Sequence, residues 1–167
     1  MLHGQPARAV SLDLSATTRS PAEFASLASS KSINDTSLVG EWKFTSVFYR
    51  GQELPAPNPD LNLRYTFNAD GTSRMYWDRA NRAGFCERQG RYLIHDEILT
   101  DEVTWINPQN DSSCHQDPDM QVGTRSSVPF RFDHDRLVLD LPLGDESIGY
   151  IWTRADPSVR FRITAAR

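Results

Sequence analysis

The sequence lacks long apolar runs, and no stretch of its 167 residues approaches the length of a transmembrane helix. It also lacks an excess of basic residues, because 18 Lys and Arg stand against 22 Asp and Glu and give a net charge of -4 at pH 7. This charge argues against binding duplex nucleic acid through its phosphates. We therefore expect one soluble globular domain, with no membrane span and no nucleic-acid partner.

Cysteine and lysine are scarce. Two cysteines are too few for a disulfide-dense scaffold or a four-cysteine zinc site. Lys31 and Lys43 are the only lysines, and the arginines are scattered from Arg8 to Arg167 without forming a run. Arginine suits the recognition of phosphate or carboxylate. The scatter, however, favours a bias in composition over a dedicated anion surface.

The motifs of common enzymes are missing as well. The sequence contains no Gly-X-Ser-X-Gly, phosphate loop, dinucleotide fingerprint or His-Glu-X-X-His. The run His115-Gln116-Asp117-Pro118-Asp119 offers alternating ligand types, but its loop context makes a metal site unspecific. No catalytic residue, metal site or cofactor is therefore predicted, and nothing indicates an oligomeric state.

The first 37 residues differ from the rest, since they are rich in Ser, Thr and Ala and show no alternation. Within this N-terminal extension, Ser20-Pro21-Ala22-Glu23 forms a capping box, which predicts a short helix at about 21–29. The start of the chain has no apolar core of a signal peptide, so no intact export signal is visible.

From Leu38 onward, apolar residues recur with period two, which is the pattern of strands. Short connections between the runs require antiparallel pairing. We predict an all-β domain over 38–156, an eight-stranded up-and-down barrel, with a two-sheet sandwich as the alternative. Residues 157–167 form a C-terminal tail, in which 159–163 alternate as a possible extra strand. The predicted strands are 40–50, 63–67, 72–78, 85–95, 99–106, 128–133, 137–141 and 148–154.

The run Leu38-Val39-Gly40-Glu41-Trp42 at the first strand resembles the lipocalin and wider calycin superfamily, in its divergent bacterial form. The resemblance implies that Trp42 closes one end of the barrel and packs against an arginine of the last strand, for which Arg154 is at the matching place. The hairpin Tyr65-Thr66-Phe67-Asn68-Ala69-Asp70-Gly71-Thr72 is also similar to bacterial lipocalin-like domains. The two later signature regions of the family are not clearly present, which indicates a divergent domain.

Cys86 begins a predicted strand, and Cys114 lies in a polar loop over 107–124. A disulfide between them would pin this loop to the barrel rim and stabilise the fold by roughly 3–4 kcal/mol in the chain-entropy model. It would also imply an oxidising compartment, so we expect a periplasmic or secreted protein. Two free thiols in a cytoplasmic protein are the alternative.

Aromatic side chains are the strongest lead to a ligand site. Alternation places ten of them, including Phe132 and Trp152, on inward faces, where they either line a cavity or fill the core. An inward arginine such as Arg74, Arg88 or Arg131 could orient a polar group of a ligand, and Glu87 or Asp101 could also point into the barrel. The predicted lining residues are Phe44, Phe48, Tyr65, Phe67, Tyr92, Trp105, Phe130 and Tyr150.

The leading functional hypothesis is a binding protein that holds a small hydrophobic or amphipathic molecule in its barrel. The loop 107–124 and the proline-rich connection 51–61 would cover the opening. The alternatives are a structural or protein-interaction module with a filled barrel, and a barrel-type enzyme such as an isomerase, cyclase or hydrolase. An open interior would favour the first or the last, and a filled one the interaction module.

Overall fold

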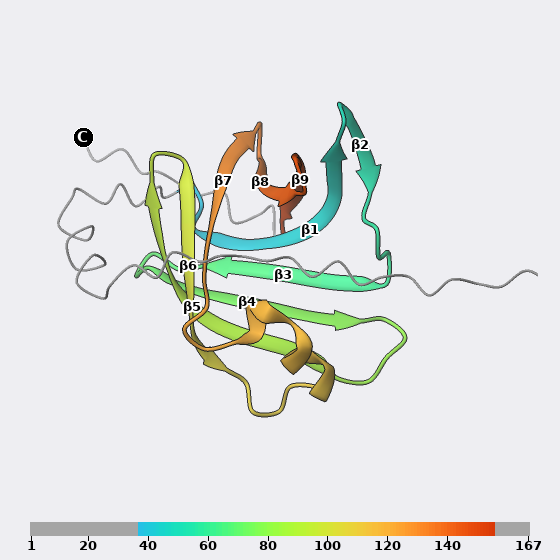
Figure 1. Ribbon diagram of the computed structural model, residues 1–167, viewed down its shortest axis with the longest axis vertical. Coiled ribbons are helices and arrows are strands. Elements are labelled where there is room, and N and C mark those ends of the chain that lie inside the picture. The colour runs from blue at the N-terminus through green and yellow to red at the C-terminus, as the bar shows by residue number, and fades with distance from the viewer. Residues whose placement is uncertain (1–36, 156–167) are drawn as a thin grey trace, which may run out of the picture. The chain divides into compact units, whose positions relative to one another are not determined.

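The computed structural model describes residues 37–155, so the helix expected at 21–29 and the possible strand at 159–163 lie outside the described residues (Figure 1). Nine strands and two short 3₁₀ helices make up the described part. They are β1 (Gly40–Tyr49), β2 (Gln52–Pro55), β3 (Leu61–Phe67), β4 (Thr72–Arg79), β5 (Phe85–His95), β6 (Ile98–Ile106), η1 (Ser112–Gln116), η2 (Pro118–Met120), β7 (Arg125–Asp133), β8 (Arg136–Leu143) and β9 (Glu146–Arg154).

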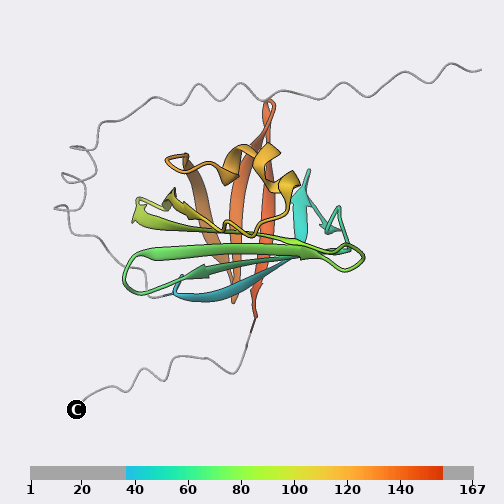
Figure 2. The same cartoon turned by 90° about the horizontal axis from the view of Figure 1, so that it is seen from below.

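The strands form one antiparallel sheet in the order β2-β1-β3-β4-β5-β6-β7-β8-β9, and β1 also pairs with β9. This last pairing closes a barrel of eight strands, while β2 remains outside it as a short strand paired with β1. Strands β7, β8 and β9 run across the direction of β3, β4 and β5 (Figure 1 and Figure 2). The predicted up-and-down barrel is confirmed, and the sandwich alternative is wrong.

Trp42 and Arg154 lie together at the end of the barrel where β1 begins, which we call the closed end. The Arg154 guanidinium stacks over the Trp42 ring, 4.3 Å from its centre. It also donates to the carbonyl oxygens of Val39 at 2.9 Å and Ser37 at 2.5 Å, and the Trp42 indole donates to the Leu38 carbonyl at 2.8 Å. A Cβ atom at Gly40 would lie 2.5 Å from Nη1 of Arg154, so only glycine leaves room for this arginine.

The largest fully buried side chains gather near the closed end. Phe67 and Leu137 have no exposed surface, and Trp42 and Trp152 are at most 2% exposed. The rings contact one another from strand to strand, with centres 5.5 Å apart for Phe44 and Trp152. Such contacts bury most of the apolar surface that drives folding, so this half of the barrel is a packed core.

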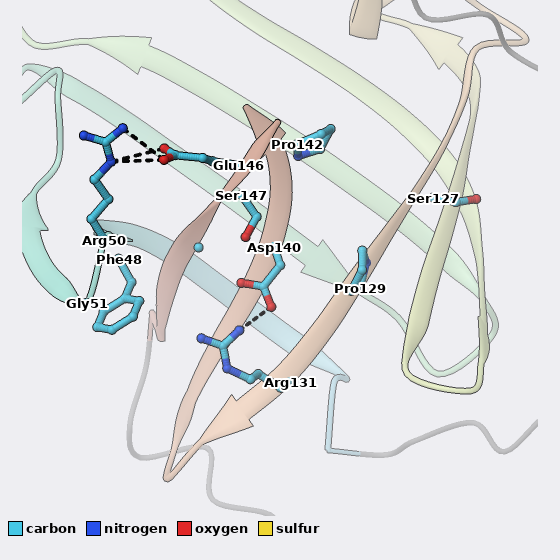
Figure 3. A pocket seen from close by; sticks show the side chains of 11 residues that line it. Phe48, Arg50, Gly51, Ser127, Pro129, Arg131, Asp140, Pro142, Glu146 and Ser147 are labelled. Carbon is cyan, nitrogen blue, oxygen red and sulfur yellow. Dashed lines mark hydrogen bonds and ion pairs between the residues drawn. The ribbon is translucent and has the colours of Figure 1, made fainter. Parts of the chain in front are cut away.

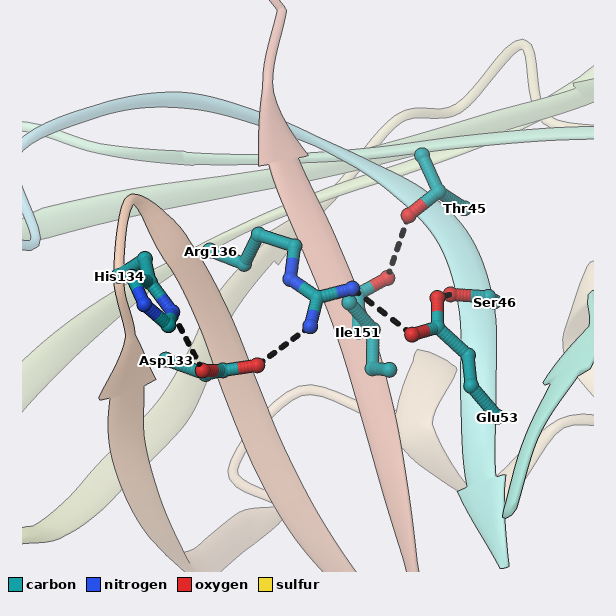
Figure 4. Close-up of polar contacts among 7 residues, drawn as sticks. All are labelled: Thr45, Ser46, Glu53, Asp133, His134, Arg136 and Ile151. Atoms are coloured by element: carbon teal, nitrogen blue, oxygen red, sulfur yellow. Dashed lines mark hydrogen bonds and ion pairs between the residues drawn. The ribbon is translucent and has the colours of Figure 1, made fainter.

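A bulge in β1 changes which side chains face the interior. Phe44 pairs with Trp152, but the next pair is Ser46 with Ile151, so Thr45 is an extra residue. The Thr45 hydroxyl donates to the Ile151 carbonyl at 3.2 Å (Figure 4). The predicted inward position of Phe48 is therefore wrong: the extra residue reverses the alternation, and Phe48 faces outward with 40% of its surface exposed.

A second bulge lies in β6. Gln89 pairs with Trp105 and Gly90 pairs with Val103, so Thr104 is the extra residue there. Val103 is buried inside the barrel, whereas Trp105 faces outward and is 39% exposed. The predicted inward position of Trp105 is wrong for the same reason as that of Phe48.

Strand β2 lies within the proline-rich connection 51–61, for which the sequence predicts no strand. Side chains hold it against the barrel. Ser46 donates to the Glu53 carboxylate at 2.6 Å, and Arg136 binds the other oxygen of Glu53 at 2.9 Å (Figure 4). Arg136 also pairs with Asp133, so one guanidinium links β8 to both β2 and the end of β7. Further along the same connection, Ala56 packs against the core.

We predict that Arg154→Met lowers the free energy of unfolding by about 2 kcal/mol or more, because it removes two charge-assisted hydrogen bonds and a cation–π contact. Arg50→Met is the matched control, since Arg50 is 70% exposed and pairs with Glu146 at the surface. That control should change stability by less than about 1 kcal/mol. Urea unfolding measures both, and equal effects would contradict the role assigned to Arg154.

Candidate functional site

The end of the barrel opposite Trp42, which we call the open end, is partly covered by η1 and η2. Cys86 and Cys114 are joined by a disulfide, which confirms the predicted pairing. Met120 of η2 packs against this disulfide and is 2% exposed. Trp77 and Ile106 pack against the same cluster. The loop over 107–124 is therefore an ordered cover fixed to β4, β5 and β6.

Hydrogen bonds fix the loop to β5 on either side of the disulfide. The Asn110 side chain accepts from the Glu87 amide at 2.8 Å and donates to the Glu87 carbonyl at 2.9 Å. The Asp111 amide donates to the Phe85 carbonyl at 3.0 Å, and its carboxylate accepts from the Ser113 amide at the start of η1. These contacts hold the cover in one place independently of the covalent bond.

Several inward-facing side chains of β3, β4, β7 and β9 are only half-buried. The strand register turns them toward the interior, where they pack against the core, and yet solvent reaches each of them. A fully sealed interior would bury such apolar groups completely. These inward-facing apolar side chains are therefore partly accessible to solvent. The residues are Leu63, Met75, Val128, Ile148 and Tyr150.

A group of charged and polar side chains is buried inside the barrel, and we call it the polar cluster (Ser73, Arg88 and Asp101). Their exposed fractions are 2%, 4% and 3%. Nη1 of Arg88 binds one oxygen of Asp101 at 2.5 Å, and the Ser73 hydroxyl donates to the other at 2.5 Å. The three residues come from β4, β5 and β6, so the cluster joins three neighbouring strands.

Gly90 makes room for this cluster. A Cβ atom there would lie 2.7 Å from the Ser73 hydroxyl oxygen and 2.8 Å from Oδ1 of Asp101. Both distances are too short for any real side chain, so the contact between Ser73 and Asp101 requires glycine. A glycine inside a strand often marks such a close approach, and this was the one sequence signal that could have pointed to the cluster.

Tyr65 lies next to the polar cluster, with its ring centre 5.8 Å from the Arg88 guanidinium carbon. Burial raises the pKa of Tyr65 far above its usual value, and the nearby Asp101 carboxylate raises it further. The hydroxyl therefore stays protonated and neutral at physiological pH.

Asp119 of η2 lies at the rim, accessible to solvent yet surrounded by protein. Desolvation and the neighbouring Asp117 raise the pKa of Asp119, and the charges of Arg88 and Asp101 also act on it. Its carboxyl group is thus close enough to the polar cluster to feel its charges.

Two buried nitrogen atoms in the barrel have no protein acceptor among residues 37–155. They are Nε of Arg88 and Nε1 of Trp152. Both carry a hydrogen, and both residues flank Tyr65, since the ring centres of Tyr65 and Trp152 are 6.0 Å apart. A buried donor without a partner costs roughly 1–3 kcal/mol, so an acceptor at this place would be strongly favoured.

A shallow groove of about 800 Å³ crosses the outer face of β1, β9, β8 and β7 (Figure 3). Phe48 forms part of its wall, and its charged residues pair with one another: Arg50 binds Glu146, and Arg131 binds Asp140. The charged groups named here are already paired with each other. The groove therefore offers less reason for a ligand to bind than the interior, where two buried donors lack acceptors.

The structure divides the predicted lining residues into three groups. Tyr150 faces inward and is half-buried at the open end, whereas Phe48 and Trp105 face outward. The others face inward and are at most 6% exposed; they are Phe44, Tyr65, Phe67, Tyr92 and Phe130. Their rings contact one another, with centres 4.2 Å apart for Tyr65 and Phe67 and 5.1 Å for Phe67 and Tyr92.

Of the polar candidates, Arg88 and Asp101 point into the barrel and meet there. Arg74 and Glu87 instead pair with each other at 2.6 Å on the outside, and Arg131 lines the outer groove. The pairing of Arg88 with Asp101 was missed because it depends on the register between β5 and β6, which no local motif encodes.

Within residues 37–155, no three His, Cys, Asp or Glu side chains gather closely enough to hold a metal ion. The same part of the chain has no helix of the length and apolarity needed to cross a membrane.

No protein-family model matches the sequence, and no curated protein matches it. In fold, the chain is similar to the crystal structure of a lipocalin-like protein from Bacteroides uniformis ATCC 8492, with 16% identity and a TM-score of 0.49 over 71% of this chain and 98% of that one. It is also similar to an uncharacterized protein from Bacteroides eggerthii DSM 20697, with 15% identity and a TM-score of 0.45 over 70% and 98%. At these identities the likeness concerns the fold alone.

The lipocalin-like architecture follows from the strands themselves. Eight strands pair in sequence order, β1 closes on β9, and Trp42 lies under Arg154 at the end where β1 begins. These are the features that the resemblance in sequence implied, so the divergent lipocalin-like fold is confirmed.

We predict that Asp101→Asn lowers the free energy of unfolding by about 3 kcal/mol or more, because it leaves the Arg88 charge buried without its partner. Asp140→Asn is the matched control, since Asp140 pairs with Arg131 near the surface, where the Arg131 side chain is 46% exposed. The control should cost less than about 1 kcal/mol.

Replacing both partners tests whether the pair serves stability. The double variant Arg88→Met with Asp101→Leu should recover most of the loss, because apolar side chains of similar volume avoid the desolvation of two charges. Chemical unfolding of the three variants measures these differences. A double variant less stable than Asp101→Asn would show that the pair itself stabilises the fold.

The disulfide joins residues 28 apart in sequence. We predict that Cys86→Ala with Cys114→Ala lowers the free energy of unfolding by roughly 3–4 kcal/mol. Unfolding of the native protein with reductant should give a similar loss, and reductant should not affect the double variant. A loss below about 1 kcal/mol in both experiments would mean that the hydrogen bonds of Asn110 and Asp111 suffice to hold the loop.

Proposed function

We propose that this protein binds a small amphipathic molecule inside its barrel, and that the molecule enters at the open end. The observation that carries the proposal is the buried Arg88, whose Nε lacks a protein acceptor although the side chain is only 4% exposed. A binding site for a small molecule combines apolar walls with a few fixed polar groups. Here the apolar side chains at the open end and the polar cluster below them supply both.

The surroundings of the open end support entry there. The half-buried Leu63, Met75 and Ile148 offer apolar surface whose burial by a ligand is worth about 25 cal/mol per Å² before the costs of ordering. The disulfide-linked loop covers the opening on the side of β4, β5 and β6. Ala56 brings the proline-rich connection against the core. These two segments are the proposed cover of the site.

A structural or protein-interaction module is the second candidate. It is favoured by the packed rings near the closed end, which leave that half of the barrel filled. It is also favoured by the outer groove, where Phe48 is exposed. Neither observation accounts for a buried arginine with an unpartnered donor, which is why binding in the interior comes first.

An enzymatic role finds less support. A buried carboxylate such as Asp101 can serve as an acid or base, but both of its oxygens already accept hydrogen bonds from Arg88 and Ser73. The histidines at 95, 115 and 134 are all exposed. Asp101 is therefore better suited to holding Arg88 in place than to moving a proton.

The disulfide suits an oxidising compartment. We infer that the protein acts in a periplasm or outside the cell, where an apolar ligand would need a carrier or receptor.

A neutral apolar fluorophore such as N-phenyl-1-naphthylamine tests the proposed function. We predict saturable binding that Tyr150→Ala weakens about five- to thirty-fold, because the half-buried Tyr150 ring faces the open end and its loss removes about 1–2 kcal/mol of contact. Trp105→Ala is the control, since this even larger aromatic side chain faces outward. It should leave the affinity within about twofold.

Fluorescence titration measures both affinities, and urea midpoints confirm that the variants are folded. Absence of saturable binding to the native protein, or equal losses in the two variants, would reject a ligand site inside the barrel.

A further inference from the structure

We propose that the interior site selects ligands whose polar part is a neutral oxygen acceptor, such as the carbonyl of a ketone, ester or amide. The acceptor oxygen receives the Nε hydrogen of Arg88, and Trp152 supplies a second donor. This inference rests on the proposed function and names the class of ligand that the site prefers.

The chemistry of the unsatisfied groups carries the proposal. Among residues 37–155, the buried side-chain atoms that lack a hydrogen-bond partner are Nε of Arg88 and Nε1 of Trp152. Both are donors, since an indole nitrogen and a guanidinium nitrogen cannot accept. A ligand that completes this site must therefore bring acceptors.

The two donors belong to side chains that lie next to the same residue, Tyr65. The Arg88 guanidinium carbon lies 5.8 Å from the Tyr65 ring centre, and the Trp152 ring centre lies 6.0 Å from the same Tyr65 ring centre. Both donor side chains are therefore neighbours of Tyr65. A ligand with one carbonyl oxygen supplies an acceptor for one donor, and an ester, with two oxygens, has enough acceptors for both.

The charge around the site argues for a neutral ligand. Arg88 is the cation of the polar cluster, and the Asp101 carboxylate at 2.5 Å already compensates it. Asp119 adds a further acidic group near the rim. A carboxylate ligand would lose its hydration and meet no uncompensated positive charge, which makes its burial costly. A neutral carbonyl avoids this cost and still accepts from the charged guanidinium.

The rest of the ligand is apolar. Met75 is the strand neighbour of both Tyr65 and Arg88, so a side chain without strong hydrogen-bonding groups lies directly beside Arg88. From there, the path to the open end passes the half-buried Leu63, Ile148 and Tyr150. An alkyl chain would bury its surface along this path.

Three probes with the same carbon chain test the class of ligand: 2-decanone, decanoate and decane. Each competes with the neutral fluorophore for the native protein at pH 7. We expect 2-decanone to bind about tenfold or more tightly than either of the others, because it alone is a neutral acceptor. Equal affinity for the ketone and the alkane, or tighter binding of decanoate, would overturn this inference.

Such results would leave the proposed function standing, because the fluorophore would still bind inside the barrel. Failure of the fluorophore itself to bind would reject the proposed function, and this inference with it. The two failures are therefore distinct.

The double variant Arg88→Met with Asp101→Leu tests whether the polar cluster causes the preference for the ketone over the alkane. The ratio of ketone to alkane affinity should fall to about one in this variant. Arg131→Met with Asp140→Leu is the matched control, because this pair lies in the outer groove, and it should keep the native ratio. An unchanged ratio in the first variant would contradict the role of Arg88.

An NMR measurement on the native protein does not depend on the folding of any variant. The sequence has four tryptophans, whose indole N–H signals can be followed separately. Addition of decyl acetate, an ester, should shift the signal of Trp152, which lacks an acceptor. The signal of Trp42, which already donates to the Leu38 carbonyl, should stay in place. A shift of Trp42 without a shift of Trp152 would contradict the proposed position of the ligand.

Discussion

The hydrogen bonding of β1 to β9 is the constraint on which the rest of the structure depends. It joins the first and last strands of the barrel, so that one face of every strand shares a single interior. The stack of Arg154 on Trp42 secures this pairing at its end, where the two residues face each other across the strands. Closure also removes sheet edges within the barrel and leaves β2 as the short strand at its side. Any charged side chain on the inner face must then find its partner inside, which is the situation of Arg88 and Asp101.

Two bulges decide which residues belong to that interior. Thr45 in β1 and Thr104 in β6 are extra residues that have no partner in the neighbouring strand. Beyond each of them, the inward and outward positions of the side chains are exchanged. Phe48 and Trp105 therefore lie outside, while Val47 and Val103 lie inside. The exchange replaces large rings by smaller side chains on the inner face. This leaves less of the barrel filled than strict alternation would have done.

The parts of the fold that depend on local pattern could be predicted from the sequence. Period-two alternation and short turns identified the strands, and the resemblance to the lipocalin superfamily implied that Arg154 packs on Trp42 at one end of the barrel. Two cysteines allow one pairing, so the partners of the disulfide could be predicted, while two free thiols remained the alternative until the structure showed the bond. The bulges could not, because an extra residue such as Thr45 is chemically ordinary and is revealed only by its partner strand. The polar cluster was hidden for a related reason: Arg88 and Asp101 lie on different strands, and their meeting depends on register.

The burial of the charged pair Arg88 and Asp101 inside the barrel needs an explanation. Burying two charges costs several kcal/mol per ion before their attraction compensates, and apolar residues of similar volume are often as stable. The cluster also requires glycine at position 90 and leaves a donor of Arg88 unpartnered. The constraint on a neighbouring position and the unmet hydrogen bond are the reasons for which we propose that this group serves a ligand. In the proposed binding mode, Asp101 and Ser73 hold the guanidinium in a fixed orientation, so that Nε meets the ligand's acceptor without the cost of ordering a flexible side chain.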